Sequence, residues 1–386
     1  MKKSLLITLI ILAVLLLIPA VSFIRWTFQE KKPIDVVILD KTVPTLERLG
    51  HRSFVYVLTN ARFVRKEKGG SFSAAKDYYG FIPLRPVREK QFRKKDFRLT
   101  ELIDLADNND ALYYADTYGV FFNDWYQGIK KTRRSRKLYG GLNNNDYLLM
   151  SEMKKRDKLV IVEYNTFDYP TAGLERFKTE ELLGISSKGW MGQYYRSLDT
   201  VGSQAVPNWM PELYRKEYRE PWTFTKPGVV LLNDNSIIVL EEGKQLISAF
   251  PVITTSPEYS GRFNIPEEVV FTNTFDIIDP GQNNVVSAFN LETTPAGDTL
   301  LAMNGLSPVF PAVTLEPLAG RTFYFSGDFA NNSIPFWTSR FRNVDKLARA
   351  LFYTEGENDP KSFFWLYYKP LINSIFNEYN DNPAVD

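Results

Sequence analysis

Residues 34–40, IDVVILD, form an almost unbroken apolar run that ends at Asp40. A short run rich in Val and Ile is typical of a strand buried on both faces of a sheet. Two similar runs occur at 111–115 and 158–162. Between and around these runs, apolar residues follow a helical spacing at 45–60, 100–106 and 146–156. This alternation of strand and helix indicates a parallel sheet with crossover helices.

The second half of the chain has a different pattern. Apolar runs at 229–232 and 237–240 flank the polar residues 233–236 (NDNS), a combination that favours a β-hairpin. Further strands are predicted at 249–254, 268–271, 285–291, 312–315 and 321–326, and two helices near 344–352 and 362–379. The predicted fold class is α/β, with a doubly wound, mostly parallel sheet and an antiparallel-rich C-terminal half.

The N-terminus predicts a membrane anchor. Residues 5–24 contain no charge, and a helix needs about 20 apolar residues to span the ~30 Å hydrocarbon core of a bilayer. We therefore expect a transmembrane signal anchor at 1–26, a linker at 27–33 and a single α/β body at 34–386. A second boundary within the body is possible near 207–221, which begins and ends with proline.

The orientation of this anchor follows from its short basic start. Lys2 and Lys3 precede the first apolar segment, which favours an N-terminus inside the cell. The predicted localisation is a single-pass protein of the cytoplasmic membrane with an extracytoplasmic body. Removal of the segment after the small residues at 20–22 is the alternative.

The composition excludes several chemistries. The 386-residue chain contains no Cys and one His. It therefore has no thiolate nucleophile, no Cys-based metal site and no mechanism that needs two imidazoles from one chain. No Gly-rich phosphate loop and no GxSxG elbow is present. The sequence indicates no particular cofactor.

Acidic residues follow the predicted strands. In open parallel sheets, ligands bind beyond the carboxyl ends of the strands. Carboxylates placed there can divide general acid and base roles, as in glycoside hydrolysis, or hold a hard cation. An acid after a strand is also the ordinary N-cap of the next helix. The candidate catalytic residues at these positions are Asp40, Asp116, Glu163 and Asp328.

Aromatic and polar residues crowd the loops after these strands. Aromatic rings can stack on sugars, while acids and amides can bind sugar hydroxyls. The candidate substrate-binding residues are Tyr118, Asp124, Trp125, Asn165, Trp190 and Tyr194. Their arrangement along the chain is similar to the lining of a saccharide cleft.

The runs 34–40, 111–120 and 158–166, closing with 321–328, resemble the class I glutamine amidotransferase-like, flavodoxin-like domain. More narrowly, they resemble uncharacterised membrane-anchored bacterial proteins that carry a degenerate form of it. The resemblance covers about half of the chain and implies the fold. It does not imply glutaminase activity, because the nucleophilic Cys is missing and the single His lies early in the chain.

We expect the body to handle an envelope glycan or exopolysaccharide, by binding or by hydrolysis at the strand-end carboxylates. The alternative is a non-catalytic membrane-associated scaffold that contacts a partner or anionic lipid through basic stretches at 62–68, 85–98 and 130–137. The expected partners are the membrane, through residues 5–24, and a glycan or anionic polymer. Nucleic acid is not expected outside the cell.

Overall fold

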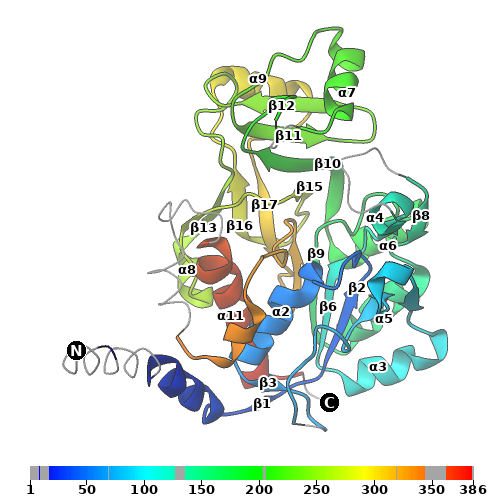
Figure 1. Cartoon of the computed structure of the whole chain (residues 1–386), viewed down its shortest axis with the longest axis vertical. Helices are drawn as coiled ribbons and strands as arrows, with labels where there is room; N and C mark the ends of the chain where they lie inside the picture. Colours follow the sequence, from blue (N-terminus) through cyan, green and yellow to red (C-terminus); the bar gives the residue numbers. More distant parts are fainter. Residues whose placement is uncertain are drawn as a thin grey trace.

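The computed structural model describes residue 8 and residues 17–67, 69–126, 135–202, 206–318, 320–343 and 362–384. Its largest element is a ten-stranded sheet, above which lies a smaller lobe built on a four-stranded sheet (Figure 1). The strands in order across the large sheet are β14 (Glu268–Val270), β13 (Val252–Thr255), β16 (Asn284–Asn290), β17 (Val309–Leu315), β18 (Thr322–Phe325), β9 (Leu159–Glu163), β6 (Ala111–Asp116), β2 (Val36–Asp40), β4 (Tyr79–Pro83) and β5 (Phe92–Lys95).

The centre of this sheet is parallel and its flanks are antiparallel. β18, β9, β6, β2 and β4 pair in parallel, in that order. On one flank, each strand pairs antiparallel with the next in the order β14, β13, β16, β17 and β18. On the other flank, β5 pairs antiparallel with β4. The sheet is therefore mixed, and the prediction of a mostly parallel sheet is wrong. The antiparallel C-terminal strands add to the same sheet instead of forming a separate half.

Helices cover both faces of the parallel strands, because alternate residues of those strands point to opposite sides. Even-numbered residues of β2, such as Ile38, pack with one helical layer, and Val37 and Leu39 pack with the other. The first layer contains α2 (Leu49–Asn60) and α11 (Lys369–Asp381), and the second contains α3 (Leu102–Asn108), α5 (Asn144–Lys155) and α6 (Gly173–Leu183).

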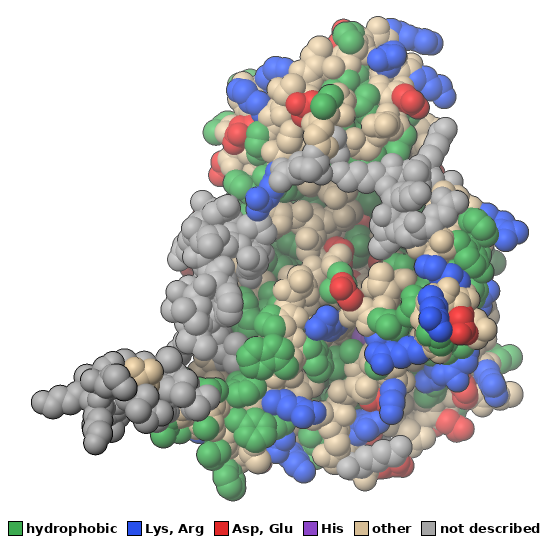
Figure 2. Space-filling model, viewed as in Figure 1, with side chains coloured by type: hydrophobic (Ala, Val, Ile, Leu, Met, Phe, Trp, Pro, Cys, Tyr) green, Lys and Arg blue, Asp and Glu red, His purple; other side chains and the backbone are tan. Residues whose placement is uncertain are grey.

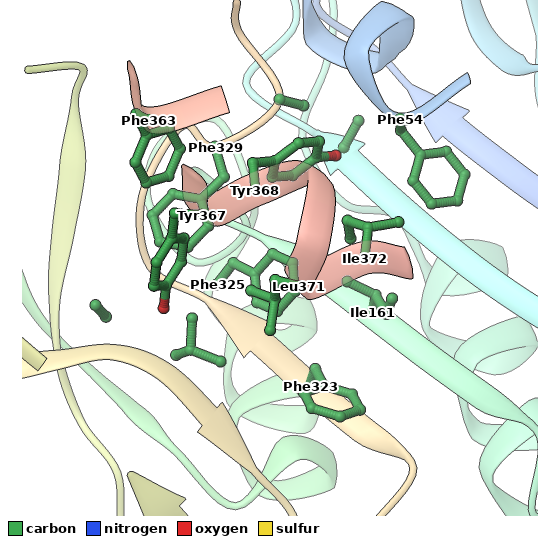
Figure 3. Close-up of a cluster of buried hydrophobic side chains, with 14 of the residues drawn as sticks. Phe54, Ile161, Phe323, Phe325, Phe329, Phe363, Tyr367, Tyr368, Leu371 and Ile372 are labelled. Atoms are coloured by element: carbon green, nitrogen blue, oxygen red, sulfur yellow. The ribbon is translucent and has the colours of Figure 1, made fainter. Parts of the chain in front are cut away.

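The C-terminal helix fills the centre of the first layer (Figure 3). A π-helical turn, Phe364–Tyr368, leads directly into α11 and directs Tyr368 toward the sheet. Beside it, the Phe54 ring of α2 stacks on Tyr113 of β6, with ring centroids 3.8 Å apart, and meets the edge of Phe376. Residues more than 250 positions apart in the chain thus share one core.

The upper lobe is a sheet with a helix on its outer side. Its strand order is β12 (Ile237–Glu241), β11 (Gly228–Leu232), β10 (Ser186–Tyr195) and β15 (Phe275–Asp279). Val229 and Leu231 face the main core, whereas Val230 packs with Met210 of α7 (Trp209–Tyr218). β15 continues from the lobe to the large sheet, where Phe275 pairs with Gly327. The lobe therefore lies over the carboxyl ends of the parallel strands (Figure 1).

The N-terminal prediction requires correction. The expected membrane-spanning helix at 5–24 falls largely on residues outside those described. In the described part of the chain, no helix has both the length and the apolar character needed to cross a bilayer. This finding contradicts the predicted transmembrane helix and the predicted single-pass localisation at the cytoplasmic membrane. Residues 17–27 are helical, and the Trp26 indole N–H donates to the Thr59 carbonyl of α2 at 3.1 Å.

Other predicted elements agree with the structure to different degrees. The runs beginning at 34, 111, 158 and 321 correspond to β2, β6, β9 and β18. Residues 61–96, for which the sequence analysis predicts no strand, contain β4 and β5, and the sequence analysis also missed β10 and β15. The predicted helix at 344–352 lies outside the described residues. The boundary near 207–221 falls on α7 of the upper lobe.

The aromatic core joining α2, β6 and α11 should dominate stability. Phe54 is fully buried, so Phe54→Ala leaves a cavity and should lower the free energy of unfolding by about 3–5 kcal/mol. Phe177 of α6 is 63% exposed, and Phe177→Ala should change it by less than about 1 kcal/mol. Urea unfolding of both variants measures the difference. Equal losses for the two variants would contradict this packing.

Candidate functional site

The four predicted catalytic acids lie at one edge of the sheet. Asp40, Asp116 and Glu163 are the last residues of β2, β6 and β9, and Asp328 comes shortly after β18. These four strands are consecutive neighbours and run in parallel, so their carboxyl ends meet. The acids also affect one another electrostatically, because the charges of Asp40 and Asp328 both raise the pKa of Asp116. We call these four residues the acid crest.

Asp40 forms the inner side of the crest. It is fully buried, and its Oδ2 lies 2.6 Å from Nδ1 of His51 on α2. His51 Nε2 lies 2.8 Å from the Ala74 carbonyl, which can only accept, so this nitrogen carries a proton. Asp40 and His51 are therefore held in direct contact, with neither side chain open to solvent. Gly50 makes room for this contact, since a Cβ there would lie 2.7 Å from Asp40 Oδ2.

Glu163 is equally enclosed. The Tyr113 hydroxyl donates to Glu163 Oε1 at 2.6 Å, and the Ala330 N–H donates to Oε2 at 3.2 Å. The Tyr368 hydroxyl, brought in by the π-helical turn, lies 3.0 Å from that of Tyr113. Burial raises the pKa of Glu163 well above its ordinary value, and the charge of Asp328 adds to this effect. Glu163 is thus an interior carboxyl held by hydroxyl groups.

Asp116 and Asp328 are the accessible members of the crest, each 7% exposed. Burial raises the pKa of Asp116 well above its usual range, although the Tyr118 N–H donates to Asp116 Oδ1 at 2.7 Å. Burial also raises the pKa of Asp328 to about 6, against an opposing hydrogen bond from Asn331 Nδ2 at 2.8 Å. Two carboxyls with raised pKa values at one accessible edge can exchange protons with a bound ligand.

Asp276 of β15 is a fifth acid at this edge, and the sequence analysis missed it. The backbone N–H of Asn165 donates to Asp276 Oδ2 at 2.7 Å, and the Tyr324 hydroxyl donates to the same oxygen at 3.2 Å. Burial raises the Asp276 pKa well above its ordinary value, and the charges of Asp168 and Asp328 raise it further. The run FDIID at 275–279 contained the signal, but its strand was not predicted.

Aromatic rings extend outward from the crest. The Tyr118 ring lies 4.8 Å from Phe121, and the Phe121 ring lies 6.1 Å from Tyr169. Tyr118 is half-buried and Tyr169 is exposed, so this series of rings runs from the acids to the surface. Figure 2 shows that this face is hollowed beneath the upper lobe and that acidic side chains are visible in the hollow. Phe121 and Tyr169 were not among the predicted residues.

The remaining predicted binding residues lie apart from the crest. Trp125 is fully buried against Phe81, with ring centroids 5.0 Å apart, and Trp190 is buried in the main core. Tyr194 stacks on Phe250 at 5.0 Å. Asp124 accepts from the Phe121 N–H at 3.2 Å, and burial raises its pKa. In this conformation, only Tyr118 and Asn165 of the six predicted binding residues adjoin the acids.

The glycine pair Gly119 and Gly140 fixes the loop that carries Tyr118. Gly119 has φ +99°, and a Cβ there would lie 2.1 Å from the Tyr139 carbonyl oxygen. Gly140 has φ +137° and would collide in the same way with the Tyr118 carbonyl oxygen. The segments around Gly119 and Gly140 therefore cross with their backbones in contact, which holds Tyr118 beside Asp116.

The chain was also compared with known proteins. No protein-family model matches it, and no curated protein matches it in sequence. A crystal structure of a putative ThuA-like protein from Bacteroides uniformis is similar over 78% of this chain and 84% of its own, at 8% identity and a TM-score of 0.34. A β-galactosidase from Bacillus circulans sp. alkalophilus is similar over 77% of this chain and 30% of its own, at 8% identity and a TM-score of 0.32. Likeness at these scores assigns neither a family nor an activity.

The raised pKa of Asp328 predicts a pH-dependent stability. The folded chain binds this proton more tightly than the unfolded chain, so the stabilisation is complete below about pH 4 and is lost as the pH rises through about 6. Asp328→Asn removes the titration. As the pH rises from about 4 to about 7, the free energy of unfolding of the variant should increase relative to that of the wild type, by up to about 3 kcal/mol. Urea unfolding across this range measures the gain.

Asp279→Asn is the matched control for this measurement. Asp279 is half-buried, and hydrogen bonds from Gly281 N–H and Lys188 lower its pKa. Its contribution is present at neutral pH and is lost as the pH falls, which is the opposite sign. A difference between Asp328→Asn and wild type that stays constant from about pH 4 to about pH 7 would contradict the assignment.

Proposed function

We propose that the chain binds a saccharide at the acid crest and hydrolyses a glycosidic bond there. The observation that supports this proposal is that Asp116 and Asp328 lie at the same edge of the sheet. Both are acids with raised pKa values, both are slightly accessible, and the ring series Tyr118, Phe121 and Tyr169 leads away from them. Convergent carboxyls with neighbouring aromatic faces are the groups that sugar recognition uses.

The two accessible acids suit different roles in hydrolysis. Asp116 has the more strongly raised pKa, because burial and then the charges of Asp40 and Asp328 raise it, so it is the group that donates a proton to the departing glycosidic oxygen. Asp328, titrating near 6, takes a proton from the attacking water. The water oxygen bonds to the anomeric carbon as the glycosidic C–O bond breaks. Both protons are thereby accounted for.

The two interior acids act through these residues. Asp40 and Glu163 are enclosed by His51 and Tyr113 and do not face solvent, so we regard them as positioning residues. Burial and the charge of Asp40 raise the pKa of Asp116, and Glu163 and Asp116 are electrostatically coupled as well. Replacing Glu163 with Gln should therefore shift the pH profile of activity without abolishing it.

Calorimetric titration of the whole chain with a panel of oligosaccharides, together with release of reducing ends, tests the proposal. Asp116→Asn and Asp328→Asn should each lower the turnover rate by about 100-fold or more, because each removes a proton transfer. Tyr118→Ala should weaken binding about tenfold through lost stacking. Glu258→Gln, an exposed acid of α8 (Pro257–Phe263), is the control and should change nothing. Binding and turnover that survive in Asp116→Asn would refute the proposal.

A second candidate function rests on the outer strand β5. Arg93 and Lys94 of this strand are exposed, as are Arg88 and Arg98 beside it. None of these four side chains forms an ion pair with another described residue. A row of unpaired cations on an edge strand discourages strand pairing between molecules, and it also attracts anionic polymers. The chain would then act as a scaffold and not as an enzyme.

Salt dependence separates the two candidate functions. Binding of dextran sulfate through β5 should weaken steeply between about 0.1 M and about 1 M salt, as the Debye length falls from about 10 to about 3 Å. The double variant Arg93→Ala/Lys94→Ala should lose this binding, whereas Lys216→Ala on α7 should retain it. Retention of binding by the double variant, or no change with salt, would remove the scaffold function.

A further inference from the structure

Hydrogen-bond acceptors outnumber donors at the acid crest. The crest and Asp276 together bring five carboxyl groups to one edge of the sheet, and the charge of Asp328 acts on Asp116, Glu163 and Asp276. Burial is the largest cause of the raised pKa values of these acids, and apart from hydrogen bonds the main remaining influences are the charges of other acids. The edge therefore has a deficit of donors and of positive charge.

Two buried acceptor atoms in this cluster have no partner. Asn165 Oδ1 and Asp276 Oδ1 are shielded from solvent and accept no hydrogen bond from any described residue. They belong to one assembly, because the Asn165 N–H donates to the other oxygen of Asp276. The Asn165 carbonyl in turn accepts from the hydroxyl of Thr117, the residue after Asp116. An unpaired buried acceptor costs about 1–3 kcal/mol, so these atoms favour a ligand that brings donors.

Two basic side chains close to Asp40 are already engaged elsewhere. Lys41 follows Asp40 in the chain, but its Nζ donates to the Gly141 carbonyl and pairs with Asp146 of α5. His51 is enclosed between Asp40 and Ala74. Neither side chain hydrogen-bonds to Asp276, so a ligand can supply the positive charge there.

We propose that the sugar bound at the acid crest carries a free, protonated amine, which donates to Asn165 Oδ1 and Asp276 Oδ1. The inference rests on the proposed saccharide function and specifies its substrate class as an amino sugar. An ammonium group offers three donors and one positive charge, and these are what the two unpaired acceptors and the surrounding carboxyls need. A neutral hydroxyl supplies one donor and no charge.

A metal ion would satisfy the same charge, but the side chains are not arranged for one. Within the described ranges, no three His, Asp or Glu side chains converge closely enough to hold a metal. An organic cation needs no such convergence, because each N–H of an ammonium group takes a separate acceptor. The neighbouring ring of Tyr118 can lie against the sugar face while the amine reaches the acids.

Three β-1,4-linked tetrasaccharides that differ only at C2 test this inference. Calorimetric titration of the whole chain at about pH 5.5 would compare the tetramers of glucosamine, N-acetylglucosamine and glucose, which carry an ammonium, an acetamide and a hydroxyl group at this position. We expect the glucosamine tetramer to bind at least about tenfold more tightly than the other two, a difference of about 1.4 kcal/mol. Equal affinity for all three would overturn the inference and leave the saccharide function standing.

Two variants locate the amine. Asp276→Asn removes the charge at one acceptor, and Asn165→Gly removes the other acceptor while keeping the positive φ of 59° that this position adopts. Each should abolish the preference, so that the glucosamine and glucose tetramers bind the variant with equal affinity. Circular dichroism confirms folding, and Glu258→Gln serves as the control. A preference that persists in both variants would overturn the inference.

The same titrations separate this inference from the proposed function. If none of the three tetramers binds, both the saccharide function and the amine inference fail. If ethanolamine, which carries an amine and no sugar ring, binds as tightly as the glucosamine tetramer, the site recognises amines and the saccharide function fails. Tight binding of the glucosamine tetramer with no binding of ethanolamine supports both.

Discussion

The parallel pairing of β18, β9, β6 and β2 is the constraint on which the site depends. Hydrogen bonds between these neighbours bring their carboxyl ends to one edge, so acids separated by almost 300 residues of sequence become mutual electrostatic neighbours. Slipping any one strand by one residue would turn its terminal acid to the other face of the sheet. The antiparallel strands on either side and the upper lobe enclose that edge without altering its order.

Burial then divides the acids into two kinds. Asp40 and Glu163 lie inside the fold, where His51 and Tyr113 satisfy them. Asp116 and Asp328 are each 7% exposed, so they are the more accessible pair. The interior acids can therefore act only through their effect on the outer two, which are the members that a ligand can approach. The C-terminal π-helical turn contributes to this division, because it places Tyr368 beside the Tyr113 hydroxyl.

The sequence predicts the part of this arrangement that depends on local pattern. Apolar runs ending in acids identify β2, β6 and β9, and known preferences of parallel sheets predict that ligands bind beyond them. Strand order, and with it the convergence of the acids, depends on long-range pairing that no local pattern contains. Asp276 was missed because its strand, which joins the lobe to the large sheet, was not predicted from the local pattern. Trp125 and Trp190 were expected at the surface, but tertiary packing buries both rings.

The most direct test of this account is a carboxyl-detected NMR titration of the Asp side chains, without and with bound oligosaccharide. The account predicts that one aspartate, assigned through Asp328→Asn, titrates near 6 in the free protein and that saccharide shifts its resonance together with that of Asp116. An Asp328 carboxyl that titrates near its ordinary value of about 3.9, with neither resonance responding to any saccharide, would contradict it.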